Sequence, residues 1–423
     1  MARGFLRHRV TQNAGALALV QIVGYIAPFL VLMRLTTVFG ATTYGVIAFS
    51  IGIVQISTVI VDVGFLLSAT QRISVSREKH HFVARLAGAV FCIKLAAFLA
   101  TAVAIVAFAM LTDKYADYTM LFVLSVLPLL GHTLQPIWLF SGIERMGYIT
   151  VSMVVTKMSF VGLVYLFVQG ESDYLRVPLS DGVAQLVGAA IGILLIYRSG
   201  YRIALPTRRD LRYAFRLTGG FYLSRLAMTA YSGSAIIILG LVATPALVAV
   251  YSLAEQLYRA IQSLFGPVVQ ALYPYIVRER DVILLRKVAL GFAAAAVVGG
   301  VAGYFISPWL IGRIFGPEWL SSLAVMNVFF AALVVHVLTV LAGYPLAAAL
   351  KRLDVANSSV SWGCILYLSL ALMVVATDRA TPVTFAWLVV ATEAYVLLHR
   401  SIVLLPGAVR LYRQQKATGR AAG

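Results

Sequence analysis

Eight charged side chains lie at or inside the long apolar stretches of this chain, where an ion is costly unless it has a partner or faces water. Five are basic and three are acidic: Arg34, Lys94, Lys157, Arg225 and Arg259, against Asp62, Glu255 and Glu393. An excess of positive charge at membrane depth favours a cavity that accepts an anion, and phosphate is the anion that arginine suits best. These residue types therefore predict an anion-binding site.

Glu255 and Arg259 are the most informative pair. They are four residues apart on one predicted helix, and Gln262 follows on the same face. At 1.5 Å per residue, Arg259 lies roughly 20 Å into that helix, near the middle of the membrane. The pair either neutralises itself for helix packing or lines a water-filled pathway for substrate.

Two more basic residues are predicted to be deep. Lys157 and Arg225 each lie about nine residues into their helices, roughly 13 Å from the membrane surface, which is too deep for easy snorkelling to the headgroups. Arg34 lies near an outer helix end and is either interfacial or part of the substrate site. Lys94 either snorkels or is buried.

The acidic residues leave more alternatives open. Asp62 is either a coupling-ion site or the partner of a buried arginine, and Glu393 has no evident neighbour. Arg400, near a helix end, is predicted to snorkel. His132 and His336 stand alone on different helices and are predicted to be hydrogen-bonded core residues.

The elements that must position these side chains are membrane helices. The chain has 423 residues, of which 61% are hydrophobic and 12% charged, with a mean hydropathy of +0.91. This composition excludes a water-soluble enzyme and a disordered chain. Apolar stretches long enough to span a bilayer occur at about 14–36, 45–70, 84–111, 119–141, 148–169, 180–197, 215–240, 246–277, 288–312, 321–349, 358–377 and 383–406. Pro136 and Pro267 are among the prolines predicted to kink these spans.

Basic residues are distributed unevenly among the connections. With the N-terminus inside, 24 Lys and Arg residues fall in cytoplasmic segments and 4 in outer loops. The positive-inside rule therefore predicts that both termini are cytoplasmic. The same rule accounts for the net charge of +18, so no nucleic-acid partner is expected.

The longest polar connection, 198–212, falls near the middle of the chain. It predicts an all-α polytopic protein with about twelve transmembrane helices in two pseudo-symmetric six-helix bundles, residues 1–205 and 206–423. In transporters built from such repeats the substrate site lies near the midplane, between the halves.

Catalytic and cofactor motifs are absent from the sequence. There is no GxxxxGK[ST] phosphate loop and no HExxH motif, and Cys92 and Cys364 form no CxxC. We therefore expect no enzyme activity, cofactor or metal site.

Several segments resemble bacterial O-antigen and polysaccharide flippases, of the multidrug/oligosaccharidyl-lipid/polysaccharide exporter superfamily. The likeness begins in 21–45, is most specific over Asp62–Arg72, and returns in 251–274 and 314–316. The resemblance implies outward flipping of an undecaprenyl-diphosphate-linked oligosaccharide by a twelve- or fourteen-helix protein of the bacterial inner membrane. The polymerase and chain-length machinery of the same pathway are its expected partners, besides membrane lipids.

On this reading Arg225, Arg259, Lys157 and Arg34 contact the diphosphate, while Asp62 and Glu255 couple transport to an ion or form charge pairs. The alternatives are another exporter of the superfamily, for lipid II or for drugs, and a membrane-embedded glycan polymerase. A cationic-drug exporter would be expected to carry an acidic excess at depth, and a polymerase usually has a large outer loop.

Overall fold

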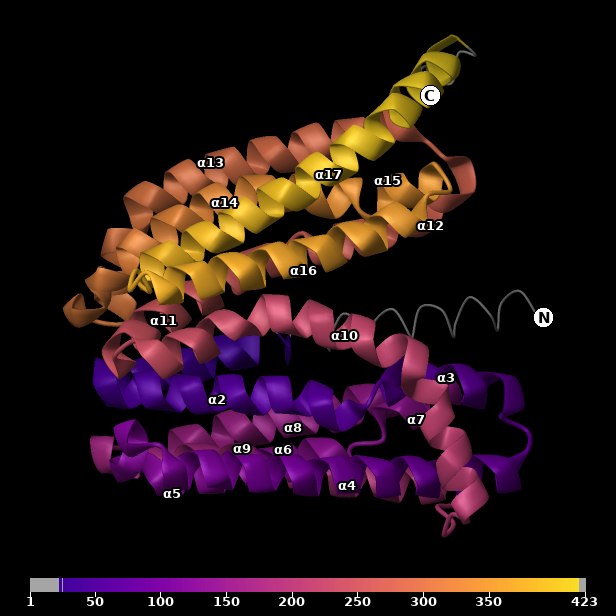
Figure 1. The fold of residues 1–423 in the computed structure, drawn as a ribbon, viewed down its shortest axis with the longest axis vertical. Helices are drawn as coiled ribbons and strands as arrows, with labels where there is room; N and C mark the ends of the chain where they lie inside the picture. The colour runs from indigo at the N-terminus through magenta and orange to yellow at the C-terminus, as the bar shows by residue number, and fades with distance from the viewer. Residues whose placement is uncertain (1–22, 25, 418–423) are drawn as a thin grey trace. The chain divides into compact units, whose positions relative to one another are not determined.

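The computed structural model describes residues 23, 24 and 26–417, and for 219–232 it describes the backbone alone. Its contacts divide the chain into two compact units, Met1–Thr229 and Ala230–Gly423. Figure 1 shows that α-helices make up nearly the whole of the described chain.

The first unit contains a helix at Ile26–Val38 and eight labelled α-helices, joined by short 3-10 turns. They are α2 (Ala41–Asp62), α3 (Phe65–Ser76), α4 (His80–Leu111), α5 (Thr119–Leu124), α6 (Val126–Leu134), α7 (Ile137–Gly142), α8 (Met146–Phe167) and α9 (Arg176–Arg198). Helix α10 (Arg208–Val242) begins in this unit and ends in the second.

Small residues allow the helices of the first unit to pack closely. A Cβ on Gly131 of α6 would lie 2.7 Å from the backbone carbon of Gln185 on α9, and one on Gly192 would lie 2.7 Å from the ring of Pro136. Lipid tails give helices no hydrophobic reason to associate, so close backbone contact through small residues is a main source of stability. Here it brings α6 and α9 together.

The second unit contains seven further α-helices. They are α11 (Pro245–Ser263), α12 (Gly266–Glu279), α13 (Val282–Ile314), α14 (Leu323–Ala342), α15 (Tyr344–Ala349), α16 (Leu353–Ala376) and α17 (Pro382–Ala417). Helix α14 packs against α11, α13 and α17. Its buried side chains, among them Phe329 and Leu333, form part of the core of this unit.

The predicted spans are confirmed within the described residues. Ten helical segments there are long and apolar enough to cross a membrane, and shorter apolar helices occupy Ile26–Val38 and Gly233–Val242. These two fall within or beside the stretches expected at 14–36 and 215–240, of which 14–22 lies outside the described residues. The domain boundary expected at 205/206 stays a prediction.

Several of the described spans are interrupted. Val63 and Gly64, both with positive φ, separate α2 from α3. Pro136 stands between α6 and α7, and Pro267 occupies the first turn of α12. Since proline lacks the N–H group that a continuing helix needs, these two breaks confirm the kinks expected there.

Candidate functional site

The Glu255–Arg259 ion pair forms within α11. Arg259 Nη2 donates to Glu255 Oε1 at 2.8 Å. The Glu255 side chain is 10% exposed, whereas that of Arg259 is 44% exposed. The carboxylate is therefore held inside the unit, while the guanidinium keeps a surface on which an anion can bind.

Glu393 has a partner that the sequence did not indicate. His336 Nδ1 on α14 lies 3.0 Å from Glu393 Oε1 on α17. The predicted hydrogen-bonded state of His336 is thereby confirmed. Because 57 residues separate the two side chains, only the packing of α14 on α17 brings them together.

Tyr258 connects these two pairs. Its ring stacks on Phe329 of α14 at 4.6 Å and meets the ring of His336 edge-on at 6.4 Å. Glu255, Tyr258 and Arg259 occupy adjacent turns of α11, so one polar cluster forms where α11, α14 and α17 meet. We name Glu255, Tyr258, Arg259, His336 and Glu393 the α11 cluster.

Arg400 corrects an expectation from the sequence. It does not snorkel: its side chain is buried, and it donates to Ser359 Oγ at 2.9 Å, Thr339 O at 2.6 Å and Ala356 O at 3.1 Å. The carbonyls come from α14 and α16, and so tertiary packing supplies hydrogen-bond acceptors that a helix facing lipid would lack. Arg400 joins α17 to both helices.

In the first unit, Asp62 pairs with Lys94. The Lys94 ammonium lies 3.5 Å from Asp62 Oδ1, and its side chain is 3% exposed. Asp62 Oδ2 also accepts the backbone N–H of Leu66 at 3.2 Å, in the first turn of α3. Asp62 is thus the partner of a buried cation, a lysine rather than an arginine, and it also satisfies the start of the helix after the α2–α3 break.

Lys157 lies beside a chain of polar residues that the sequence did not single out. Gln135 donates to Gln185 Oε1 at 2.8 Å, and Gln185 donates to Asp181 Oδ1 at 3.2 Å. Lys157 on α8 interacts electrostatically with Asp181 on α9. The sequence does not point to Asp181, because this residue lies at the edge of a predicted span, where charged residues are common.

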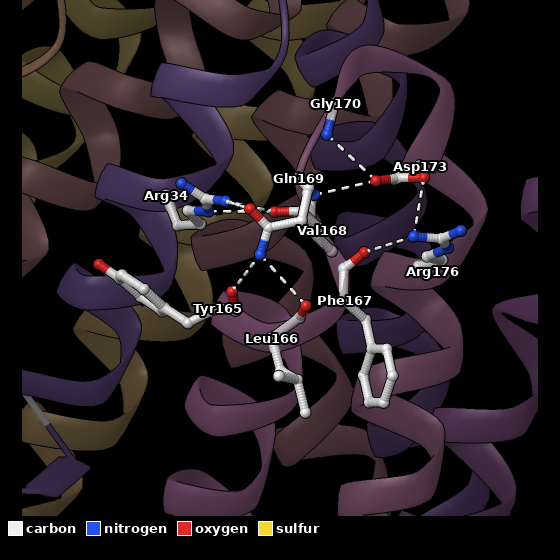
Figure 2. A network of polar contacts seen from close by, with 9 residues as sticks. All are labelled: Arg34, Tyr165, Leu166, Phe167, Val168, Gln169, Gly170, Asp173 and Arg176. Atoms are coloured by element: carbon white, nitrogen blue, oxygen red, sulfur yellow. Dashed lines mark hydrogen bonds and ion pairs between the residues drawn. The ribbon is translucent and has the colours of Figure 1, made fainter.

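Arg34 holds the end of α8 (Figure 2). Its guanidinium donates to Val168 O at 3.0 and 2.8 Å, and to Gln169 Oε1 at 2.8 Å. Gln169 donates to Tyr165 O at 2.7 Å and Leu166 O at 3.1 Å, and Arg176 donates to Phe167 O at 2.8 Å. Side chains thereby satisfy four successive carbonyls that the helix end leaves open, which gives Arg34 a structural task.

The predicted site residues are thus distributed over both units. Arg34, Lys157 and Asp62 are described in the first unit, and Glu255 and Arg259 in the second. The side chain of Arg225 lies outside the described residues. Their joint action on one anion stays a prediction.

No group of three or more His, Cys, Asp or Glu side chains positioned to hold a metal ion occurs in the described part of the chain. Its residues offer hydrogen-bond donors and paired charges.

Comparison with known proteins relates the chain to transporters. A family model described as "Polysaccharide biosynthesis protein" matches residues 10–279. A protein of Escherichia coli (strain K12) named "Putative O-antigen transporter" is 27% identical over 300 residues, which cover 68% of this chain and 71% of that protein. A protein of the same name from Shigella dysenteriae is 24% identical over 341 residues, covering 79% of this chain and 85% of that protein.

Solved structures share the fold. The lipid II flippase MurJ, in an inward closed conformation, has a TM-score of 0.75 at 10% identity, over 93% of this chain and 87% of that one. An inward-facing multidrug resistance MATE family transporter of the MOP superfamily has a TM-score of 0.66 at 12% identity, over 96% of this chain and 99% of that one. The likeness to these two transporter structures and the all-helical described chain confirm the predicted fold class.

Proposed function

Because this chain belongs to the polysaccharide biosynthesis protein family, we propose that it is a flippase for an undecaprenyl-diphosphate-linked oligosaccharide, an O-antigen unit or another surface-polysaccharide repeat. It moves this lipid from the cytoplasmic to the periplasmic leaflet of the bacterial inner membrane by alternating access. The family and its relatives named as O-antigen transporters support this function.

The observation that carries the proposal is the exposed guanidinium of Arg259 beside its buried glutamate partner. Arginine donates parallel hydrogen bonds to phosphate oxygens, and the diphosphate is the part that lipid-linked oligosaccharides share. Arg225 and Lys157 assist by adding positive charge, and Arg34 holds the end of α8.

The membrane potential, negative inside, favours outward movement of an anion by about 2.3 kcal/mol per charge per 100 mV. Exchange for an ion at Asp62 or Glu255 is a second source of energy. Transport through paired charges needs no bond-making residue, and we therefore assign the chain no enzyme activity. Its partners are the substrate lipid, membrane lipids, and the polymerase and chain-length machinery of the pathway.

The test is flipping in vesicles that contain the purified full-length protein and radiolabelled undecaprenyl-diphosphate oligosaccharide in both leaflets. Impermeant periodate oxidises only the sugars in the outer leaflet. Without protein about half of the label reacts, whereas an active flippase brings nearly all of it to the surface. Vesicles that contain the same labelled lipid and an equal amount of an unrelated membrane protein provide the background.

Arg225→Ala combined with Arg259→Ala should lower the flipping rate per folded molecule at least tenfold. Because this change leaves the Glu255 carboxylate without its partner, the same variant with Glu255→Gln added is measured beside it and should flip equally slowly. Arg410→Ala is the matched control, because Arg410 is exposed on the polar end of α17 and should leave the rate unchanged. Normal flipping by the double variant would disprove the cationic site, and the absence of flipping by the wild-type protein would disprove the function.

A further inference from the structure

A cavity of about 380 Å³ opens between the first turns of α4 and α10, both within the first unit. It is lined by His81, Phe82, Arg85, Leu86, Asp210 and Tyr213. None of these residues belongs to the α11 cluster or to the polar groups around Lys157, so the cavity is separate from the proposed transport site.

The cavity carries both signs of charge. His81 and Arg85 lie on successive turns of α4, and Asp210 lies in the first turn of α10. No ion pair joins Arg85 to Asp210 among the side chains that the structure describes, although the two groups interact electrostatically. A guanidinium and a carboxylate that face one cavity without bonding each other suit a ligand with both an anionic and a cationic group.

The carboxylate is held in place as an anion. The hydroxyl and backbone N–H of Thr207 donate to Asp210 Oδ2 at 2.7 and 2.8 Å. These hydrogen bonds hold the pKa of Asp210 below its usual range, and Arg85 adds to the effect. Asp210 is therefore charged at neutral pH.

The surroundings of the cavity are those of a membrane surface. It lies at the polar start of the span His80–Leu111. Leu205 and Phe215, a few residues before and after Asp210 in the sequence, are 93% and 62% exposed. The start of α10 crosses the start of α4 (Figure 1), where the rings of Phe82 and Tyr213 meet edge-on at 6.0 Å. Exposed apolar side chains among arginines are typical of a helix that lies in the headgroup region.

The guanidinium of Arg72 adds positive charge near the cavity. Arg72 of α3 lies 5.3 Å from the centre of the Phe82 ring and 5.7 Å from that of Tyr213. The two rings hold this cation beside the cavity. The phosphate of a ligand here would therefore meet more positive than negative charge.

We propose that this cavity binds the headgroup of a membrane phospholipid that carries both a phosphate and a primary ammonium, the phosphate contacting Arg85 and His81 and the ammonium contacting Asp210. The acyl chains extend past Leu205 and Phe215 into the bilayer. A lipid bound there ties the start of α10 to α4. This site is independent of the transported substrate.

The test is lipid binding to the purified full-length protein in an uncharged detergent, followed by native mass spectrometry during titration. The probes are phosphatidylethanolamine, phosphatidylglycerol, water-soluble glycerophosphoethanolamine and inorganic phosphate. We expect phosphatidylethanolamine to bind at least tenfold more tightly than phosphatidylglycerol, and both soluble probes to bind more weakly still.

Three variants separate the contacts. Arg85→Gln should weaken the binding of both lipids about tenfold, whereas Asp210→Asn should abolish the preference for phosphatidylethanolamine over phosphatidylglycerol. Thr207→Ala disturbs the start of α10 but keeps the carboxylate, so the preference should persist. Arg413→Gln, an exposed arginine on α17, is the control for loss of surface charge and should change nothing.

Equal binding of the two lipids by the wild-type protein would overturn the proposal, as would a preference that survives Asp210→Asn. Binding of glycerophosphoethanolamine as tight as that of the lipid would assign the cavity to a soluble ligand instead. Size-exclusion profiles that match the wild type show that each variant is folded.

Discussion

Three carboxylates inside the described spans have a side-chain partner from the same unit. Asp62 pairs with Lys94 and Glu255 with Arg259, and Glu393 Oε1 lies 3.0 Å from His336 Nδ1. Removing one member of a buried pair leaves an uncompensated charge, which costs more than the pair itself contributes. Single substitutions at these positions therefore affect folding as well as transport, and only paired changes separate the two effects.

The exchange of Glu255 and Arg259 makes this separation. Glu255→Arg together with Arg259→Glu keeps an ion pair on α11 but moves the guanidinium to the more buried position. We expect each single variant to be poorly expressed, and the exchanged protein to fold but flip at least tenfold more slowly. The measurement is flipping in vesicles alongside membrane protein level. Full activity of the exchanged protein would show that the Glu255–Arg259 pair has only a structural role.

Arg400 provides a prediction on stability alone. Arg400→Met leaves Thr339 O, Ala356 O and Ser359 Oγ without their donor. We expect a loss of about 3 kcal/mol, because three hydrogen bonds from a buried charged group are removed. The midpoint of unfolding in detergent checks this. Arg410→Met, exposed on the same helix, should stay within about 0.5 kcal/mol of the wild type, and equal effects would contradict the bonding described.

At the level of the helices, breaks inside the spans determine where Asp62 and Gln135 lie. The break at Val63 and Gly64 puts Asp62 at an end of α2, where its second oxygen is available to Leu66 on α3. The break at Pro136 similarly puts Gln135 between α6 and α7, opposite Gln185 of α9. Helix ends inside a span have backbone N–H and C=O groups that need hydrogen-bond partners. Polar side chains at the breaks are one source of such partners, as Asp62 is for Leu66.

Glycine contacts keep these elements close. A Cβ at Gly131 would lie 2.8 Å from the backbone nitrogen of Leu186, and so Gly131→Ala should push α6 away from α9 and cost about 1–3 kcal/mol. Gly162→Ala on α8 meets no atom within 4 Å and should be neutral, or stabilising by up to about 1 kcal/mol. Unfolding midpoints of the two variants compare them, and equal midpoints would show that α6 and α9 tolerate separation.

The described chain consists of two helical units, and its orientation in the membrane stays a prediction from charge. The positive-inside rule predicts that the 198–212 connection is cytoplasmic and that the 170–178 loop is outside. Exposed basic residues such as Arg202 and Arg208 give that connection its charge.

Cysteine labelling tests this orientation. In a background lacking Cys92 and Cys364, Ser172→Cys should react with an impermeant thiol reagent in spheroplasts, since Ser172 is exposed at the start of the span Glu171–Arg198. Ser199→Cys, at the other end of that span, should react only after the membrane is opened. The reverse labelling pattern would show that the protein has the opposite orientation in the membrane.

The sequence by itself determined the class of protein, the spans and most of the charged residues inside them, Asp181 being an exception. Hydropathy depends on local composition, and a run of some 20 apolar residues spans a bilayer whatever surrounds it. The pair Glu255–Arg259 was equally predictable, because four residues make one helical turn.

Only the tertiary structure decided which distant side chains meet. His336 and Glu393 are 57 residues apart, and Arg34 and Val168 are 134 apart, so no spacing rule relates them. Arg400 was wrongly expected at the headgroups because an isolated helix gives a long cation no better partner than water. The packing of α14 and α16 around α17 supplies buried oxygen acceptors instead, and that packing depends on the shapes of three helices at once.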